Sequence, residues 1–164
     1  MCDIPYDYSM NPSCDMCQFL GNKPLQNQIL TTKYWTVGII PDQPYLGRGL
    51  VTLLTHKASL GELSQEEWDD FAAIVRKLEP AYERAFGARP LNMGCFMNNA
   101  YRADPPHPHV HWQIFPRYKA PVELAGMTFT DDRYGSFYDD DARNPVGGEV
   151  VWEIVNRLQQ AIAL

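Results

Sequence analysis

The chain has 164 residues, of which 45% are hydrophobic and 12% aromatic, which is enough to bury a substantial core and excludes a largely disordered protein. Its 14 Lys and Arg residues against 20 Asp and Glu residues give a formal charge of −6, which argues against a broad electrostatic surface for duplex nucleic acid. No apolar stretch approaches the roughly 18 residues of a membrane-spanning helix, and the first residues do not form a basic and apolar leader. We therefore expect a cytoplasmic protein with no membrane partner.

The first part of the chain is rich in turn-forming residues and encloses the pair Cys14 and Cys17, so we expect an irregular cap over residues 1–27. In a reducing compartment such a closely spaced pair more often binds a metal or does redox chemistry than forms a disulfide. Residues 28–40 are dense in β-branched and aromatic side chains and predict a strand followed by a loop, and Leu50 to Thr55 predict a second strand.

A long helix is predicted to begin after Ser64, because Ser64 and Glu67 have the spacing of a capping box. Apolar residues then follow a 3.6-residue period as far as Gly87, where we expect the helix to end. Pro80 lies inside this stretch. Because proline removes an internal hydrogen bond at a cost of ~3 kcal/mol, we expect either a kink there or two shorter helices.

Leu91 to Asn98 and His109 to Phe115 predict two neighbouring strands. Beyond them lies an extension, residues 119–164, in which a loop region up to residue 146 is followed by apolar residues at the spacing of a C-terminal helix. The order of the elements predicts a single α+β domain over residues 1–164, with an antiparallel sheet, one long central helix and a C-terminal helix.

Three of the four histidines gather in the segment from His107 to Arg117. If this segment is extended, alternate side chains share a face, so that polar groups lie on one side and Val110, Trp112 and Ile114 on the other. The polar face would carry His107, His109, His111 and Gln113. An ordinary solvated strand is better served by Lys, Thr or Glu. Because imidazole titrates near neutral pH, such a row indicates a metal site, a nucleophile or both.

This segment resembles the signature strand of the histidine triad (HIT) superfamily of nucleotide hydrolases and transferases, in which alternating histidines are followed by Pro-Arg, here Pro116 and Arg117. The resemblance extends over about residues 14–118. It implies the HIT-like fold, with the antiparallel sheet and long helix described above. Members of the superfamily pair through the helix and a sheet edge, so the resemblance also implies a homodimer.

Two registers of the motif fit the sequence. One counts His107, His109 and His111, and the other, counted back from the proline, counts His109, His111 and Gln113. We adopt the second, because the family carries an asparagine pair on the preceding strand whose last member lies ten residues before the first motif histidine, as Asn99 does for His109.

In this register the resemblance implies that His111 is the nucleophile, which attacks the α-phosphorus and forms a covalent nucleotidyl-histidine. Its other ring nitrogen must then be protonated and oriented, commonly by a backbone carbonyl. Asn99 and Gln113 are expected to assist as hydrogen-bond donors. The implied substrate-binding side chains are those of Asn98, Asn99, Arg102, Gln113 and Arg117. For the two arginines, the alternative is solvated surface charge.

Gln113 stands where the hydrolase branches usually carry histidine, and in this respect the chain resembles diadenosine tetraphosphate phosphorylases and hexose-1-phosphate uridylyltransferases. An amide can donate a hydrogen bond to phosphate, but it cannot deliver a proton at neutral pH. We therefore expect the site to favour transfer to phosphate or another anionic acceptor over hydrolysis. Pro105 stands where the family frequently places a polar donor.

The resemblance also implies a zinc site. In many bacterial members a cysteine pair binds the metal together with a histidine after the second strand and the first triad histidine, which here are Cys14, Cys17, His56 and His109. Two thiolates and two imidazoles suit tetrahedral zinc and leave no open position, so the zinc would be structural. The alternative is a pair of unligated thiols.

The leading prediction is a nucleotidyl hydrolase or transferase that cleaves a nucleoside polyphosphate, such as a diadenosine polyphosphate, at its α-phosphate. The alternative is a nucleotide-binding or sensing protein with little turnover, because Gln113 and Pro105 replace familiar polar groups. A zinc-dependent hydrolase with a catalytic metal ranks last, because four protein ligands would close the coordination sphere.

Overall fold

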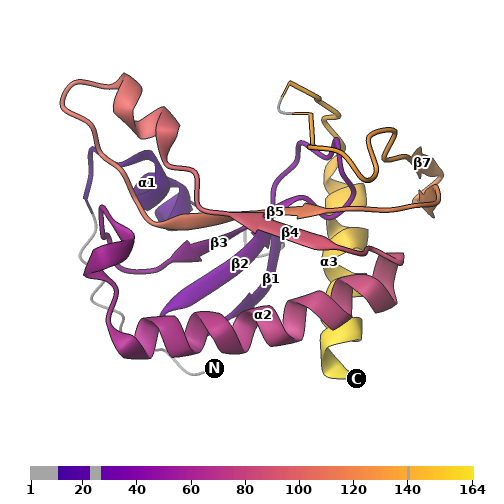
Figure 1. Cartoon of the computed structure of the whole chain (residues 1–164), viewed down its shortest axis with the longest axis horizontal. Helices are drawn as coiled ribbons and strands as arrows, with labels where there is room; N and C mark the ends of the chain where they lie inside the picture. The colour runs from indigo at the N-terminus through magenta and orange to yellow at the C-terminus, as the bar shows by residue number, and fades with distance from the viewer. Residues whose placement is uncertain (1–10, 23–26, 140) are drawn as a thin grey trace.

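A five-stranded antiparallel sheet forms the centre of the computed structural model, with the strands in the order β1-β2-β3-β5-β4 (Figure 1). The structure describes residues 11–22, 27–139 and 141–164, so the first ten residues of the expected cap and residues 23–26 lie outside the described residues. The strands are β1 (Gln28–Thr31), β2 (Trp35–Ile39), β3 (Gly49–Leu53), β4 (Leu91–Gly94) and β5 (His111–Pro116). The predicted α+β class is confirmed.

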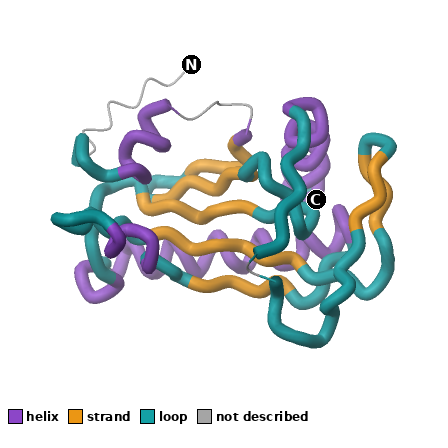
Figure 2. Tube along the Cα trace, turned by 90° about the horizontal axis from the view of Figure 1, so that it is seen from above, coloured by secondary structure: helices purple, strands orange, loops and turns teal. Residues whose placement is uncertain are grey.

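The helices lie on both faces of this sheet. Helix α2 (Gln65–Phe86) runs along one face, and α1 (Asp15–Asn22) lies with several loops over the other, as Figures 1 and 2 show. Helix α3 (Gly148–Ala163), which the sequence predicted, packs against α2, β1 and β2. Helix α1 corrects the expectation of an irregular cap. None of the helices in the described part of the chain is long and apolar enough to cross a membrane.

Helix α2 begins at the predicted capping box. The Ser64 side chain accepts a hydrogen bond from the Glu67 amide at 3.3 Å, and the Glu67 carboxylate accepts one from the Ser64 amide at 2.7 Å. The helix ends before Gly87, whose φ of 65° is left-handed. It is continuous across Pro80, so the alternative of two shorter helices is wrong. The buried face of the helix, which includes Leu78 and four other apolar side chains, offsets the missing hydrogen bond.

The single strand expected over residues 28–40 is instead two strands, because the chain turns between Thr32 and Trp35. The Thr32 amide donates to the Trp35 carbonyl at 2.9 Å. Asp70 of α2 stabilises this turn by accepting hydrogen bonds from the Thr32 hydroxyl at 2.7 Å and from the Tyr34 amide at 3.1 Å. The turn therefore depends on a side chain from a distant helix.

Two other predicted segments differ from the structure. Strand β4 ends at Gly94, and Asn98 begins a short 3-10 helix, η3 (Asn98–Arg102), in place of the strand predicted up to that residue. The expected loop after residue 118 contains a hairpin of β6 (Val122–Leu124) and β7 (Met127–Phe129). The two turn residues, Ala125 and Gly126, have positive φ angles of 49° and 74°. Positive φ at both positions is what a two-residue hairpin turn requires.

Strand β5 divides its side chains between the two faces of the sheet as predicted. Trp112 stacks on Phe71 of α2, with ring centroids 4.8 Å apart, and Ile114 is fully buried. The neighbours of these residues, His111 and Gln113, therefore lie on the opposite face, where α1 lies. On the adjacent strand β3, Thr52 pairs with His111. The candidate site is thus built on the face of the sheet that α2 does not cover.

Candidate functional site

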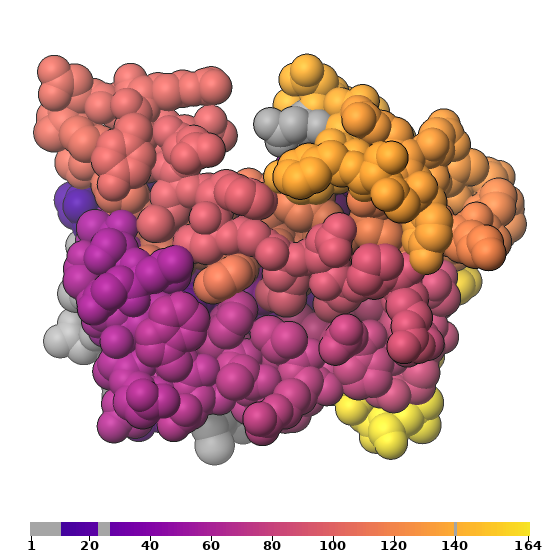
Figure 3. Space-filling model, viewed as in Figure 1, coloured from indigo at the N-terminus to yellow at the C-terminus, as the bar shows by residue number. Residues whose placement is uncertain are grey.

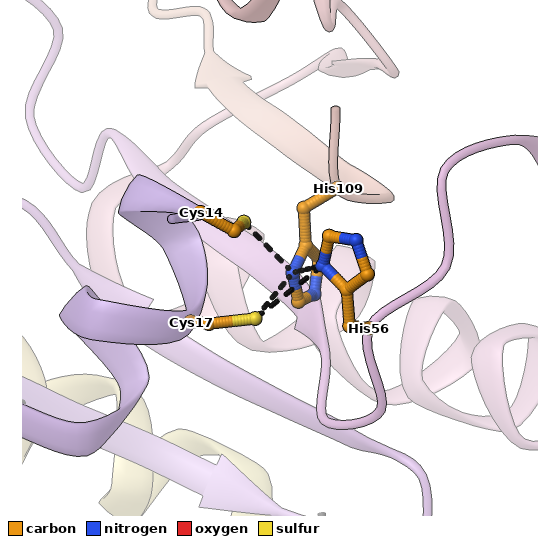
Figure 4. Close-up of side chains that lie close together, drawn as sticks. All are labelled: Cys14, Cys17, His56 and His109. Carbon is orange, nitrogen blue, oxygen red and sulfur yellow. Dashed lines mark hydrogen bonds between the residues drawn. The ribbon is translucent and has the colours of Figure 1, made fainter. Parts of the chain in front are cut away.

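Four side chains of the types that ligate metals converge above this face of the sheet: Cys14, Cys17, His56 and His109 (Figure 4). Their ligand atoms all lie within 4.8 Å of one another. Nδ1 of His109 is 3.4 Å from Cys17 Sγ, 3.6 Å from Cys14 Sγ and 3.4 Å from His56 Nδ1. These are the four residues that the sequence resemblance implied as ligands.

The four ligands come from three separate segments. Cys14 immediately precedes α1 and Cys17 lies in its first turn, where the Cys14 carbonyl accepts a hydrogen bond from the Gln18 amide at 3.0 Å. His56 follows β3, and His109 precedes β5. A metal bound here would therefore join α1 to two neighbouring strands of the sheet.

The distances fit tetrahedral zinc. Bond lengths of ~2.3 Å to sulfur and ~2.0–2.1 Å to nitrogen place two nitrogen ligands ~3.3 Å apart and a nitrogen and a sulfur ligand ~3.6 Å apart. The distance between His109 Nδ1 and His56 Nδ1 is 3.4 Å, that from His109 Nδ1 to Cys14 Sγ is 3.6 Å, and Cys17 Sγ lies 3.4 Å from Nδ1 of each histidine. These four distances are therefore those that one zinc ion requires, and all the donor atoms lie within 4.8 Å of one another.

The surroundings of His109 favour the neutral form that binds a metal. Its Nε2–H group donates to the Leu53 carbonyl at 2.8 Å, and because a carbonyl only accepts, the Nδ1 lone pair faces the cluster. Burial lowers the pKa of His109 to about 4, an effect that the Leu53 carbonyl opposes and the charges of His56 and His111 reinforce. The ring is therefore uncharged at pH 7.

The two cysteine side chains are almost completely buried, with 0% and 1% of the surfaces of Cys14 and Cys17 exposed. Burial raises the pKa of the Cys17 thiol, while a hydrogen bond from the Asn11 amide, 3.4 Å from Cys17 Sγ, lowers it. Two buried thiolates are costly without a compensating cation. The donor set therefore fits zinc, which would supply that charge.

His111 lies two residues beyond His109 and begins β5. Its Nδ1–H group donates to the backbone carbonyl of His109 at 2.8 Å. This bond fixes the tautomer and leaves the lone pair on Nε2, the ring nitrogen farther from the backbone. The ring is thus oriented as an attacking imidazole requires.

A cavity of about 280 Å³ opens beside His111. Three segments line it: the start of α1, the segment around η3, and the histidine-rich segment that leads into β5. The lining residues are Ser13, Asp15, Met16, Phe96, Met97, Asn99, Ala100, Ala103, His107, His109, His111 and Gln113. Of the side chains implied by the resemblance, the structure therefore brings Asn99, His111 and Gln113 together.

Three of the expected substrate-binding residues lie elsewhere. Asn98 and Arg102 are exposed on η3 and are not among the described residues that line the cavity. Arg117 is 3% exposed, and its guanidinium is held by the Asp131 carboxylate at 2.6 and 2.9 Å and by the Ser136 carbonyl at 2.8 Å. Because these contacts occupy its donors, Arg117 anchors the loop at residues 131–136 instead of facing the cavity.

Sequence reasoning missed the side chains that close the cavity. Ser13, Asp15 and Met16 belong to the start of α1, a short helix in a turn-rich stretch that carries no motif for it. Phe96 follows β4 and also lines the cavity. No local pattern marks these residues, since only the fold brings them beside His111.

Comparisons with known proteins agree with this geometry at the level of the fold. No protein-family model matches the chain, and no curated protein matches it in sequence. Solved structures do match. A zinc-bound histidine triad family protein from Mycobacterium smegmatis has a TM-score of 0.61 and 20% identity, over 92% of this chain and 94% of that chain.

Two similar structures are enzymes by name. A diadenosine triphosphate hydrolase from Plasmodium falciparum has a TM-score of 0.57 and 20% identity, over 85% of this chain and 78% of that one. A uridylyltransferase has a TM-score of 0.61 and 16% identity, over 92% of this chain but only 45% of the longer enzyme. This chain therefore has the fold of the histidine triad proteins, which confirms the resemblance seen in the sequence.

Proposed function

We propose that this chain is a histidine triad enzyme that transfers or hydrolyses a nucleotidyl group by way of a covalent intermediate on His111. The substrate is a nucleoside polyphosphate, such as a diadenosine polyphosphate. The observation that carries this proposal is the hydrogen bond from His111 Nδ1 to the His109 carbonyl, in a cavity that also contains Asn99 and Gln113.

The reaction has two displacements. In the first, Nε2 of His111 bonds to the α-phosphorus while the bond from phosphorus to the bridging oxygen breaks, and the electron pair leaves with the rest of the polyphosphate. The phosphorylated ring carries a positive charge, which the His109 carbonyl stabilises through the Nδ1–H bond. In the second, an oxygen of water or phosphate attacks the same phosphorus, the bond from phosphorus to Nε2 breaks, and His111 leaves with its lone pair restored; when water attacks, its proton passes to the solvent.

Gln113 supports transfer over hydrolysis. It shares a face of β5 with His111 and lines the same cavity, so its amide can donate to a phosphate oxygen. Water needs a base to become a good nucleophile, whereas inorganic phosphate at neutral pH already carries anionic oxygen. The fold alone does not distinguish transfer from hydrolysis, because the similar structures include a hydrolase and a uridylyltransferase.

Zinc in the cluster of Cys14, Cys17, His56 and His109 is the structural part of the proposal. Once bound, it would supply the positive charge that two buried thiolates need and a crosslink between α1 and the sheet. A zinc-bound protein of the same fold supports this assignment. Because four protein atoms would complete the coordination sphere of the zinc, the chemistry is left to His111 and its neighbours.

A nucleotide-binding protein with little turnover is the second candidate function. It is favoured by one observation: among the described residues that line the cavity there is no Lys or Arg side chain to neutralise a phosphate. Turnover separates the two functions. Three further sequence predictions stay predictions: a homodimer, a cytoplasmic location and one domain over residues 1–164.

The proposal is tested by incubating the protein with diadenosine tetraphosphate, with and without inorganic phosphate, and identifying the products by chromatography. The enzyme should release AMP and ATP without phosphate, and ADP and ATP when phosphate is the acceptor. His111→Ala is the control and should form neither set. Binding of the nucleotide without any products would instead establish the second candidate.

A further inference from the structure

A second and larger cavity, of about 510 Å³, adjoins the one that contains His111. Strand β4 and Phe115 of β5 form its floor, and the segment at residues 135–138 of the C-terminal extension forms a wall. Its lining comprises Asn92, Met93, Gly94, Phe96, Phe115, Gly135, Ser136, Phe137 and Tyr138. Figure 3 shows the molecule hollowed between the salmon segment near residue 100 and the orange segment near residue 135. We call this cavity the aromatic cleft.

The aromatic cleft is continuous with the candidate active site. His111, Gln113 and Phe115 alternate along β5 and therefore share one face, with Gln113 between the other two. Phe96 lines both cavities. Its ring lies so close to Gly94 that a Cβ atom there would be 2.4 Å away, which means that the glycine lets the ring lie directly on the strand.

The side chains of the cleft offer stacking surfaces to a flat ring. Tyr138 stacks on Phe115, with centroids 4.0 Å apart and planes 11° apart, and Phe137 stacks on Tyr138 at 5.1 Å and 28°. Phe137 is nevertheless 76% exposed at the edge of the cleft. Aromatic surfaces of this kind bind nucleobases by stacking, whatever the base.

The geometry of the reaction indicates which half of the substrate reaches this cleft. In phosphoryl transfer the attacking and leaving atoms lie in line on opposite sides of phosphorus. With His111 as nucleophile and the α-phosphate held near Gln113, the leaving group departs along β5 away from His111, toward Phe115. That direction leads into the aromatic cleft.

We infer that the aromatic cleft binds the nucleobase on the leaving side of a dinucleoside polyphosphate, stacked on the exposed face of Phe137 that Tyr138 does not cover. This inference rests on the proposed function and specifies its substrate class. It also gives a role to the segment at residues 135–138, which holds Phe137 and Tyr138 over β4 and β5. Selectivity for a second base would then come from the C-terminal extension.

The test compares two substrates that share the transferred adenylyl group and the leaving triphosphate. Diadenosine tetraphosphate carries a second adenosine, and adenosine tetraphosphate does not. Phe137→Ala should lower kcat/KM about ten-fold for the first, the loss expected for one stacked base, and less than two-fold for the second. Phe137→Trp should retain the preference, and Trp152→Ala, at an aromatic residue 56% exposed on α3, should change neither rate.

A binding measurement keeps this inference separate from the proposed function. Calorimetric titration of His111→Ala with diadenosine tetraphosphate should show about ten-fold weaker binding when Phe137→Ala is added. If the wild-type protein has no turnover but this loss of affinity is found, the assignment of the cleft to a nucleobase is supported and the proposed function fails. If both substrates are affected equally, or neither is, the cleft assignment is overturned and the proposed function stands. Absence of binding overturns both.

One other occupant of the cleft is a second copy of this chain. Sedimentation of the wild-type protein and of Phe137→Ala tests it under the same conditions. The inference requires the two to have the same oligomeric state. Dissociation of a wild-type oligomer on substitution would identify the cleft as an interface between copies and overturn its assignment to the base.

Discussion

The backbone carbonyl of His109 accepts the Nδ1–H bond of His111 at 2.8 Å, while the His109 ring faces Cys14, Cys17 and His56. One residue therefore belongs to the candidate metal-binding cluster through its side chain and orients the candidate nucleophile through its main chain. Because both groups belong to His109, any shift of its backbone would also turn the imidazole of His111.

The first prediction is one zinc ion per chain, measured by elemental mass spectrometry of the purified protein. Cys14→Ser and Cys17→Ser should lose the metal and lower the free energy of unfolding by about 4 kcal/mol or more, because loss of a structural metal is among the most destabilising changes. Cys95→Ser is the matched control, since this free and half-buried cysteine lies outside the cluster.

Zinc at one per chain in the Cys95 variant and near zero in the other two is the expected result. A wild-type protein that is stable and metal-free, or one with a disulfide between Cys14 and Cys17, would contradict the assignment.

The second prediction concerns the fate of the intermediate. Gln113→His places an imidazole where the amide stands, and an imidazole can activate water. In diadenosine tetraphosphate assays at a fixed phosphate concentration, the share of AMP among the products should rise several-fold relative to ADP. An unchanged ratio of AMP to ADP would mean that the residue at position 113 does not select between water and phosphate as the acceptor.

The third prediction concerns the buried ion pair of Arg117 and Asp131, whose side chains are 3% and 0% exposed. Asp131→Ala would leave the guanidinium buried without its partner, which costs about 3–5 kcal/mol of stability. Glu83→Ala removes a partner of the exposed pair with Arg89 and should cost less than about 1 kcal/mol. Chemical denaturation of both variants measures the difference, and equal losses would show that Arg117 does not anchor its loop.

Local sequence patterns predicted the parts of the structure that depend on local interactions. The capping box at Ser64 and Glu67 forms between neighbours in the chain, and the alternation along β5 follows from strand geometry alone. That the four side chains of the cluster lie together was also anticipated, but only because Cys14, Cys17, His56 and His109 stand at positions that resemble those of a known family.

Long-range contacts explain what the sequence did not predict. The turn at Thr32 forms because Asp70 reaches it from α2. Arg117 was expected at the substrate because its position fits the motif, yet Asp131 holds it in the loop that follows. The stacking of Phe115 on Tyr138 joins residues from β5 and the C-terminal extension, and nothing in either segment marks them as partners.

The most direct test of the account is the site of the covalent intermediate. The protein is mixed with diadenosine tetraphosphate, quenched within one turnover under alkaline conditions that preserve phosphoramidate bonds, and digested for mass spectrometry. We predict an adenylyl group on His111 and none in His111→Ala. An adduct on His109 would contradict the account, because that ring would then be the nucleophile and could not be the ligand that the cluster requires.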